Sequence, residues 1–289
     1  MNDPVILTDE SISPADRFLR DHAAGSLILR SNIRKAGIED HGFPFQGTYA
    51  AFVQDGKITG IAAHYWNGMV FIQAPEHAGA LVRAAMNASG RNLAGLAGPL
   101  RQVREALATL GLAERYLPDI HQELLFSLRP GCLIVPDPLQ NGTAVCRLPA
   151  PGEREVVRNM RRAYDRECGF PVPGNSGEPE RDPILETQLK ERNLWVLDVE
   201  GEPVSTAALN AALPDIVQIG AVYTLPAYRR RGYARCAVAG VIREVARRGA
   251  GDVILFTERE NTAAVKAYSA LGFQQVGDYA IAMMTARQV

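Results

Sequence analysis

Apolar residues recur with two different spacings along this 289-residue chain, and the pattern is clearest in its second half. Short continuous or alternating apolar runs predict strands at 144–148, 194–199, 203–211, 217–224, 253–257 and 273–283. Apolar residues three and four positions apart predict helices at 153–167, 183–191, 232–248 and 261–272. The polar stretch 169–182 is rich in Pro and Gly, and we expect either a disordered loop or a substrate loop there.

A fainter version of the same order fills the first half. Strands are predicted at 48–54, 58–64, 69–74, 93–96 and 123–128. Helices are predicted at 14–34, 76–86 and 99–110. Strand-strand-strand-helix-strand-helix-strand therefore occurs twice, which indicates an internal duplication, although short hairpins are common enough to mimic one.

Proline and Asn-Gly pairs punctuate the middle of the chain between Arg129 and Gly142 and disfavour regular structure there. We therefore expect an N-terminal domain at 1–130, a linker at 131–143 and a C-terminal domain at 144–289. The predicted fold class is α/β (α+β), with two domains that each hold a mixed, mostly antiparallel sheet flanked by helices.

Composition narrows the class of protein. Hydrophobic residues make up 47% of the chain, enough for each half to bury a core, and the net charge of −1 gives no argument for nucleic acid or an anionic membrane. The N-terminus lacks a signal-peptide pattern and no apolar run approaches the ~20 residues of a membrane span, so we expect a cytoplasmic protein. The preference for Arg over Lys is typical of a high-GC coding bias, and we expect a bacterial source.

The four cysteines are too far apart in sequence for a metal knuckle or a redox motif. They are Cys132, Cys146, Cys168 and Cys236, and we expect reduced thiols and no metal.

The candidate chemistry lies where the strand at 217–224 leads into a helix through the segment Arg229–Ala234. Gly232 has no Cβ, so the backbone can approach a ligand closely. The first turn of a helix leaves N–H groups unpaired, and together with the helix dipole they bind phosphate. Three arginines add charge and paired donors. These features predict a site for a diphosphate.

Two motifs resemble those of the GNAT acyltransferases. The hexad Arg229-x-x-Gly232-x-Ala234 is similar to the pyrophosphate loop of that family, and Asn261–Phe273 resembles its second signature through Asn261, Tyr268 and Gly272-Phe273. Together the motifs cover most of 144–289. The resemblance implies two GNAT-like domains and a C-terminal N-acetyltransferase that uses acetyl-CoA as co-substrate. The acceptor would be a small-molecule amine or a protein.

The resemblance also implies roles for single residues. Backbone groups of the strand end would pair with the pantetheine arm, the N–H groups of the turn would hold the diphosphate, and two arginines would reach its phosphates. The cofactor-binding residues implied in this way are Val222, Tyr223, Thr224, Arg229, Arg230, Arg231, Gly232, Tyr233, Ala234 and Asn261.

Tyr268 is the candidate general acid, which would protonate the departing sulfur of CoA; the alternative is that it only packs on the apolar face of its helix. The general base is less clear. The position used by many family members holds Gln218, an amide that can position water but not act as a base. A second family position holds Phe256, and Glu258, two residues on, is the candidate base, with a surface carboxylate or a water relay as alternatives.

The N-terminal half lacks these motifs. Its turn at 75–80 carries no arginine, and Leu107 stands where the alignment of the halves would place the tyrosine. We expect a degenerate GNAT-like domain that has lost the cofactor site. His64, Tyr65 and Trp66 would then line a substrate cleft or pack between domains.

Two other functions compete with acetyl transfer. A non-catalytic acyl-CoA-binding module with a regulatory role is favoured by the missing base and opposed by Tyr268. Aminoacyl transfer from charged tRNA is opposed by the intact CoA-type loop and the neutral charge.

Overall fold

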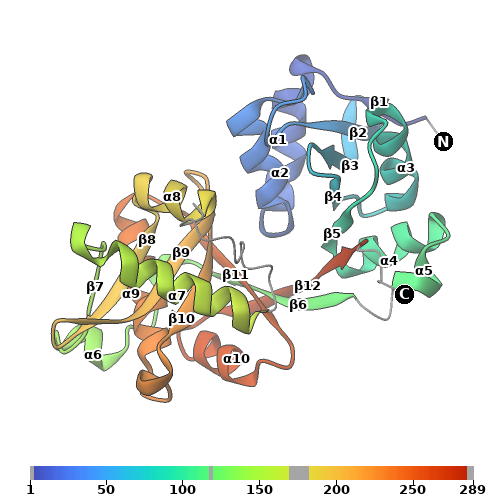
Figure 1. Cartoon of the computed structure of the whole chain (residues 1–289). Coiled ribbons are helices and arrows are strands. Elements are labelled where there is room, and N and C mark those ends of the chain that lie inside the picture. Colours follow the sequence, from blue (N-terminus) through green and yellow to red (C-terminus); the bar gives the residue numbers. More distant parts are fainter. Residues whose placement is uncertain (1–2, 117–119, 169–181, 285–289) are drawn as a thin grey trace. The chain divides into compact units, whose positions relative to one another are not determined.

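A computed structural model describes residues 3–116, 120–168 and 182–284, and it divides the chain into two compact units (Figure 1). Unit 1 comprises Met1–Leu125, Phe256–Glu260 and Gln275–Val289, and unit 2 comprises Phe126–Leu255 and Asn261–Gln274. Each unit is thus made from segments that are distant in sequence. The expected boundaries at 130 and 144 remain a prediction.

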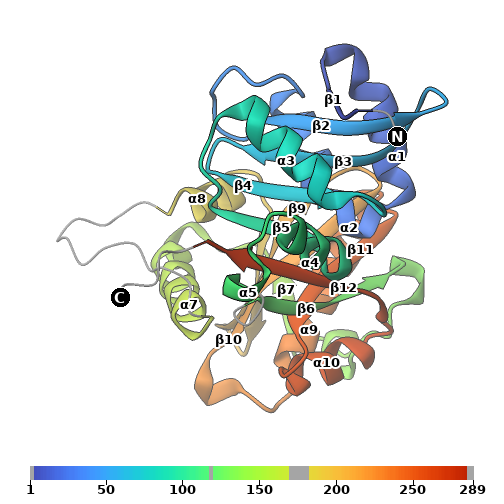
Figure 2. The same ribbon diagram turned by 90° about the vertical axis from the view of Figure 1, so that its right-hand side faces the viewer.

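Unit 1 contains a sheet in the order β1-β2-β3-β4-β5-β12, in which only β4 and β5 run parallel. Its strands are β1 (Val5–Ile6), β2 (Gly47–Gln54), β3 (Lys57–Tyr65), β4 (Met69–Gln73), β5 (Gly95–Pro99) and β12 (Gln274–Met283). Its helices are α1 (Ile12–Asp21), α2 (Ala23–Ala36), α3 (Ala78–Ser89), α4 (Leu100–Thr109) and α5 (Ala113–Tyr116). Figure 2 shows α3 and α4 over one face of this sheet.

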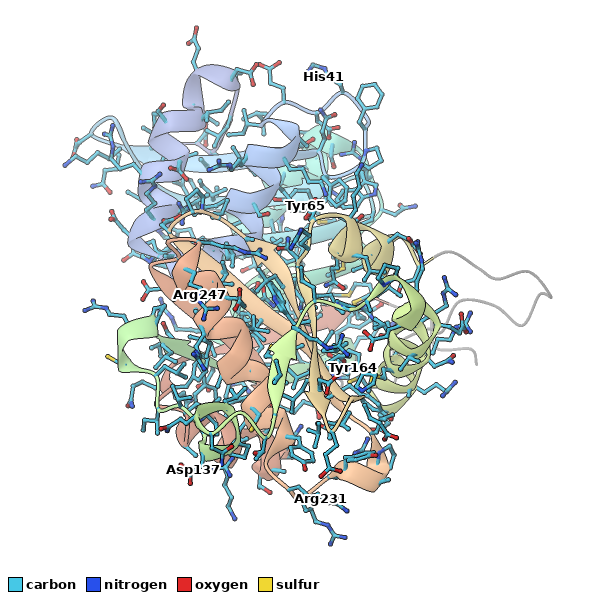
Figure 3. The ribbon with its side chains drawn as sticks, turned by 90° about the vertical axis from the view of Figure 1, so that its left-hand side faces the viewer. His41, Tyr65, Asp137, Tyr164, Arg231 and Arg247 are labelled. Atoms are coloured by element: carbon cyan, nitrogen blue, oxygen red, sulfur yellow. The ribbon has the colours of Figure 1, made fainter. Side chains whose placement is uncertain are left out.

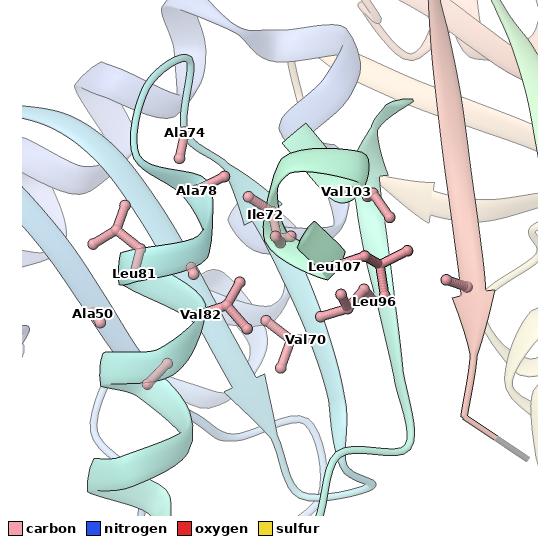
Figure 4. Close-up of a cluster of buried hydrophobic side chains, with 14 of the residues drawn as sticks. Ala50, Val70, Ile72, Ala74, Ala78, Leu81, Val82, Leu96, Val103 and Leu107 are labelled. Carbon is pink, nitrogen blue, oxygen red and sulfur yellow. The ribbon is translucent and has the colours of Figure 1, made fainter. Parts of the chain in front are cut away.

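The C-terminal strand β12 is part of the core of unit 1. It pairs with β5 in antiparallel register, from Tyr279 opposite Pro99 to Met283 opposite Gly95. Ala280 and Ala282 belong to the buried cluster that α3 and α4 form with the sheet, shown in part in Figure 4. The last strand of the chain therefore completes the sheet that the first half begins.

The prediction of a single helix at 14–34 is wrong in one respect, because the structure has two helices there. His22 leaves helical geometry with φ −120° and ψ 33°, and its N–H pairs with the carbonyl of Leu19. The break lets each helix bury its own side chains: Leu19 on α1, and Leu29 and Ile33 on α2, all lie in the cluster on one face of the sheet. Tertiary packing thus overrides a continuous helical pattern.

The strands of unit 2 pair in the order β7-β8-β9-β10-β11, with only β10 and β11 parallel. Its strands are β7 (Val145–Arg147), β8 (Leu194–Val199), β9 (Glu202–Ala212), β10 (Ile216–Thr224) and β11 (Asp252–Glu258), whose last three residues belong to unit 1. Its helices are α6 (Asp137–Gln140), α7 (Arg154–Glu167), α8 (Pro183–Lys190), α9 (Tyr233–Arg247) and α10 (Thr262–Ser269). The strand β6 (His121–Leu128) has residues in both units.

Helices cover both faces of the unit 2 strands. Val157 of α7 and Leu185 of α8 pack with Val196 and Ala208 on one face. On the other face, Gly240 of α9 touches Cys146 of β7 so closely that a Cβ could not be added there. Both units therefore have the predicted fold class, a mixed and mostly antiparallel sheet flanked by helices.

The elements predicted for 182–284 agree with the structure to within one residue at each end, except that the last helix ends earlier, at Ser269. The loop expected at 169–182 lies outside the described residues apart from Asp182, which caps α8. In the described part of the chain, no helix has the length and hydropathy that a bilayer crossing requires.

Candidate functional site

The turn between β10 and α9, where the sequence predicted a diphosphate site, has a partly left-handed backbone. Arg230 and Gly232 adopt left-handed conformations, with φ 62° and 81°, and Gly232 is the N-cap of α9. The first hydrogen bond across the helix start runs from the Cys236 N–H to the Gly232 carbonyl, 3.2 Å away. The N–H groups of Tyr233, Ala234 and Arg235 are thus those that a helix leaves unpaired.

Positive charge gathers at this turn. Within the described residues, no carboxylate lies within ion-pair distance of Arg230, Arg231 or Arg235. Arg231 extends from the turn over the ring of Tyr228, 5.7 Å from its centroid (Figure 3). The Arg235 guanidinium folds back to within 3.0 Å of where a Cβ on Gly232 would lie.

Arg235 was not among the predicted residues. A sequence signal for it exists, because a cation in the first turn of a helix opposes the helix dipole and is usually avoided. Its presence is explained if an anion lies between it and the dipole.

Arg229, in contrast, is held by the protein. Its Nη2 donates to both carboxylate oxygens of Glu167 at 2.8 and 2.9 Å, and its Nε donates to the carbonyl of Thr224 at 2.9 Å. Its guanidinium also lies 5.3 Å from the ring centroid of Tyr223, and the bond to Glu167 raises the pKa of Arg229. This side chain therefore ties the end of α7 to the end of β10.

The strand β10 is irregular just before the turn. Gly220 is opposite Ala208, but Tyr223 is opposite Thr206, so a bulge falls between them, and Ala221 has φ 49°. A bulge takes backbone groups out of the ladder. This is the stretch in which Val222 was expected to pair with a pantetheine arm.

Tyr268 lies inside unit 2 on α10, and Asn261 caps that helix by accepting a hydrogen bond from the Ala264 N–H at 3.1 Å. The Tyr268 ring packs against Phe126 and Phe273, with centroids 6.3 and 6.0 Å away. Burial raises the pKa of Tyr268 to about 12. The raised pKa keeps the phenol protonated at neutral pH, so it has a proton to donate.

The last turns of α7 connect Tyr268 with the arginine turn, the segment Arg229–Ala234. Tyr164 (Figure 3) lies close enough to Tyr268 to contribute to the raised pKa of Tyr164, although burial is the main cause. Glu167, one turn on, holds Arg229. Tyr268, the end of β10 and the turn at Arg229–Ala234 thus share one neighbouring helix.

Glu258, the candidate base, is exposed at the end of β11, in the part of that strand that belongs to unit 1. Tyr268 and the arginine turn belong to unit 2. Within unit 1, Glu258 influences a second carboxyl, Glu123 of β6. Burial first, and the charge of Glu258 second, raise the pKa of Glu123 to about 7. Only tertiary burial reveals Glu123, since in sequence it is one more carboxylate before an apolar run.

The three aromatic residues proposed to line a cleft are placed differently from one another. His64 is buried and its Nδ1 pairs with the Ser89 hydroxyl at 2.7 Å. Tyr65 is buried and its hydroxyl pairs with that of Tyr49 at 2.9 Å. Both therefore pack inside unit 1, and only Trp66 is exposed, in contact with Phe45.

Known proteins are similar to this chain in sequence and in fold. Residues 157–273 match the model of the acetyltransferase (GNAT) family. A mycothiol acetyltransferase from Nocardia farcinica is 30% identical over 214 residues, which make up 67% of this chain and 65% of that relative, so the match spans less than two thirds of the relative's length.

Solved structures extend the fold comparison over the whole chain. A GCN5-related N-acetyltransferase from Sphaerobacter thermophilus has a TM-score of 0.60 at 15% identity, over 96% of this chain and 94% of that one. A tandem GNAT protein from the clavulanic acid biosynthesis pathway has a TM-score of 0.53 at 12% identity, over 99% of both chains. Residues 157–273 thus match the acetyltransferase (GNAT) family, within a chain that has the fold of solved GNAT proteins.

Proposed function

We propose that this protein is an N-acetyltransferase that binds acetyl-CoA at the turn after β10 and transfers the acetyl group to an amine of a small-molecule acceptor. The observation that carries the proposal is the turn itself, with its glycine N-cap, unpaired helix N–H groups and unpaired arginines. The family match over 157–273 supports it.

The residues at the turn fit the diphosphate of acetyl-CoA. The N–H groups from Arg230 to Ala234 would hold its oxygens, and the side chains of Arg230, Arg231 and Arg235 would balance its charge. The bulge around Val222 offers backbone groups to the pantetheine arm. Arg229 is proposed to brace the turn through Glu167 instead of binding phosphate.

Transfer by direct attack needs two proton movements. The amine nitrogen forms a bond to the acetyl carbon while the carbon–sulfur bond breaks, and Tyr268 would give its hydroxyl proton to the departing sulfur. The proton of the attacking amine leaves either to Glu258, the candidate base, or to water.

A charged residue at Gly232 tests the proposed cofactor site. Gly232→Glu places a side chain and a negative charge where the diphosphate would lie, so we expect acetyl-CoA affinity to fall at least about 100-fold in calorimetry, a loss of ~3 kcal/mol. Gly249→Glu is the matched control. Gly249 lies at the other end of α9, also has positive φ (88°) and has open space around its Cβ position. Equal acetyl-CoA affinity for the two variants would refute the site.

The alternative function is a non-catalytic acyl-CoA-binding regulatory module. The observation in its favour is the packing of Tyr268 between aromatic rings, which is also what a purely structural tyrosine would show. Release of CoA by the wild-type protein with a panel of primary amines separates the two functions, since a binding module would release none.

We also propose that unit 1 has no cofactor site. The Ala74 N–H donates to Gln102 at 2.7 Å, and the Arg101 side chain donates to the carbonyl of Pro75, so protein groups already occupy the turn before α3. Gly79 packs so closely on Thr109 that no Cβ fits between them. These contacts support a degenerate GNAT-like half.

A further inference from the structure

One buried polar atom in unit 2 has no partner where the proposed chemistry would take place. The Oε1 of Gln218, on β10, is buried and forms no hydrogen bond with the described residues. No hydrogen bond from its Nε2 is found there either. A buried acceptor without a donor is costly, and it indicates a missing donor, either water or a ligand.

A second carboxamide lies beside it. Gln218 is opposite Ala211 on β9, but the next residue, Ile219, is opposite Leu209, so Asn210 is left as a bulge. The Asn210 side chain lies over Gly220, and a Cβ on Gly220 would collide with the Asn210 amide. Glycine at 220 therefore makes room for this amide, which is exposed to solvent and has no hydrogen-bond partner among the described residues.

The two amides share one face of the sheet. Gln218 and Gly220 are two residues apart on β10, so they point to the same side. Gly220 is opposite Ala208, which packs with Val157 of α7 and Leu185 of α8. The amide pair, Gln218 and Asn210, thus lies on the face that α7 and α8 cover.

The distance along β10 fits the length of a cofactor arm. Gln218 precedes Thr224 by six residues, which is about 20 Å at the rise of a strand. An extended phosphopantetheine arm has a similar length. If the diphosphate lies at the turn and the arm runs back along β10, the thioester ends beside the amide pair.

We propose that Gln218 and Asn210 bind the acceptor as a neutral primary amine; this rests on the acetyl transfer proposed above. The amine N–H donates to the Gln218 Oε1, which leaves the nitrogen lone pair free to form the bond to the acetyl carbon. A carboxamide accepts a hydrogen bond but takes no proton at neutral pH. In this arrangement the proton lost by the nitrogen goes to solvent water and not to Glu258, while the Tyr268 proton goes to the departing sulfur.

This arrangement makes the reaction depend on the ionisation of the acceptor itself. We would measure kcat/KM against pH for two probes, glycinamide, a weakly basic amine, and ethanolamine, a more basic one. For the wild type, the fall of kcat/KM at low pH is expected to begin at a higher pH with ethanolamine than with glycinamide, because it follows the pKa of the amine. For Gln218→Glu, which supplies a carboxylate, an additional inflection common to both amines is expected. For Asn210→Ala, a five- to tenfold rise in acceptor KM is expected, which is about one hydrogen bond.

A stability measurement tests the same atoms without activity. Gln218→Met removes a buried acceptor that no protein group satisfies, so we expect the Tm of the ligand-free protein to rise by about 2 °C or more. Gln102→Met is the matched control, because the buried Gln102 is bonded to Ala74 and its loss should lower Tm.

The outcomes separate the two proposals. Failure of the wild type to bind acetyl-CoA in calorimetry would refute the proposed function. If acetyl-CoA binds, the amide pair is overturned by an acid limb at the same pH for both amines, or by a Gln218→Met variant that loses stability as Gln102→Met does. An acid limb whose position follows the pKa of the amine, together with a Gln218→Met variant that is more stable than the wild type, supports the amide pair.

Discussion

At the scale of single residues, burial decides the protonation of the groups that matter. Tyr268 keeps its proton because its ring is enclosed by Phe126 and Phe273, and desolvation disfavours the phenolate. Glu123 keeps its proton into the neutral range for the same reason, with a further push from Glu258. Both effects follow from neighbours that are distant in sequence.

Replacing Tyr268 by Phe should separate chemistry from folding. The variant loses the proton donor, so we expect CoA release with an amine to fall by about 10²–10⁴-fold, while acetyl-CoA affinity stays the same. Tm should change little, because Phe keeps the ring that packs against Phe126 and Phe273. Tyr279→Phe, at a buried tyrosine of unit 1, is the control and should keep full activity. An active Tyr268→Phe enzyme would leave the tyrosine with a packing role only.

Glu123 predicts a specific dependence of stability on pH. Its folded-state pKa of about 7 lies above the usual 4.5, so between these values the unfolded chain loses the proton first and the native state loses stability as pH rises. Glu123→Gln removes this effect. Urea unfolding should show the variant more stable than wild type at pH 8, by up to about 3 kcal/mol, and nearly equal at pH 4. A difference that is the same at both pH values would contradict this assignment.

At the scale of elements, close contacts fix how helices meet strands in unit 2. Arg229 links α7 to β10 through Glu167 and Thr224, and Gly240 lets α9 approach β7. The first link is half exposed to solvent and contributes little to stability, whereas the second is a buried packing contact.

Gly240→Ala tests that packing contact. Alanine in a helix interior normally stabilises by about 1 kcal/mol over glycine, but here the new Cβ would overlap the side chain of Cys146. We therefore expect a loss of about 1–3 kcal/mol in chemical unfolding. In a Cys146→Gly background the overlap is gone, and the same substitution should become neutral or stabilising. A stabilised single variant would show that α9 and β7 are further apart.

At the scale of the whole molecule, the two units share one chain in alternating segments. The strand β12 reaches unit 1 only after the chain has passed through unit 2, and it supplies Ala280 and Ala282 to the core of unit 1. A fragment made of the first half alone would therefore leave β5 as an unpaired edge and part of the core open.

Expression of residues 1–130 by themselves tests this dependence. We expect a fragment that aggregates or shows no cooperative unfolding, because β12 is absent. Supplying residues 273–289 as a C-terminal extension through a flexible linker should restore a cooperative transition by circular dichroism. A stable, cooperatively folding 1–130 fragment would show that β12 is dispensable.

The sequence alone determined the features that depend on neighbours along the chain. The apolar periods located the elements of 182–284, and the glycine and arginines after β10 defined the turn, because helix caps and left-handed turns are set by a few consecutive residues. Tertiary structure decided the rest. The break at His22, the tie of Arg229 to Glu167, the raised pKa of Glu123 and the return of β12 to unit 1 all depend on burial or pairing between segments far apart in sequence, which no local pattern records.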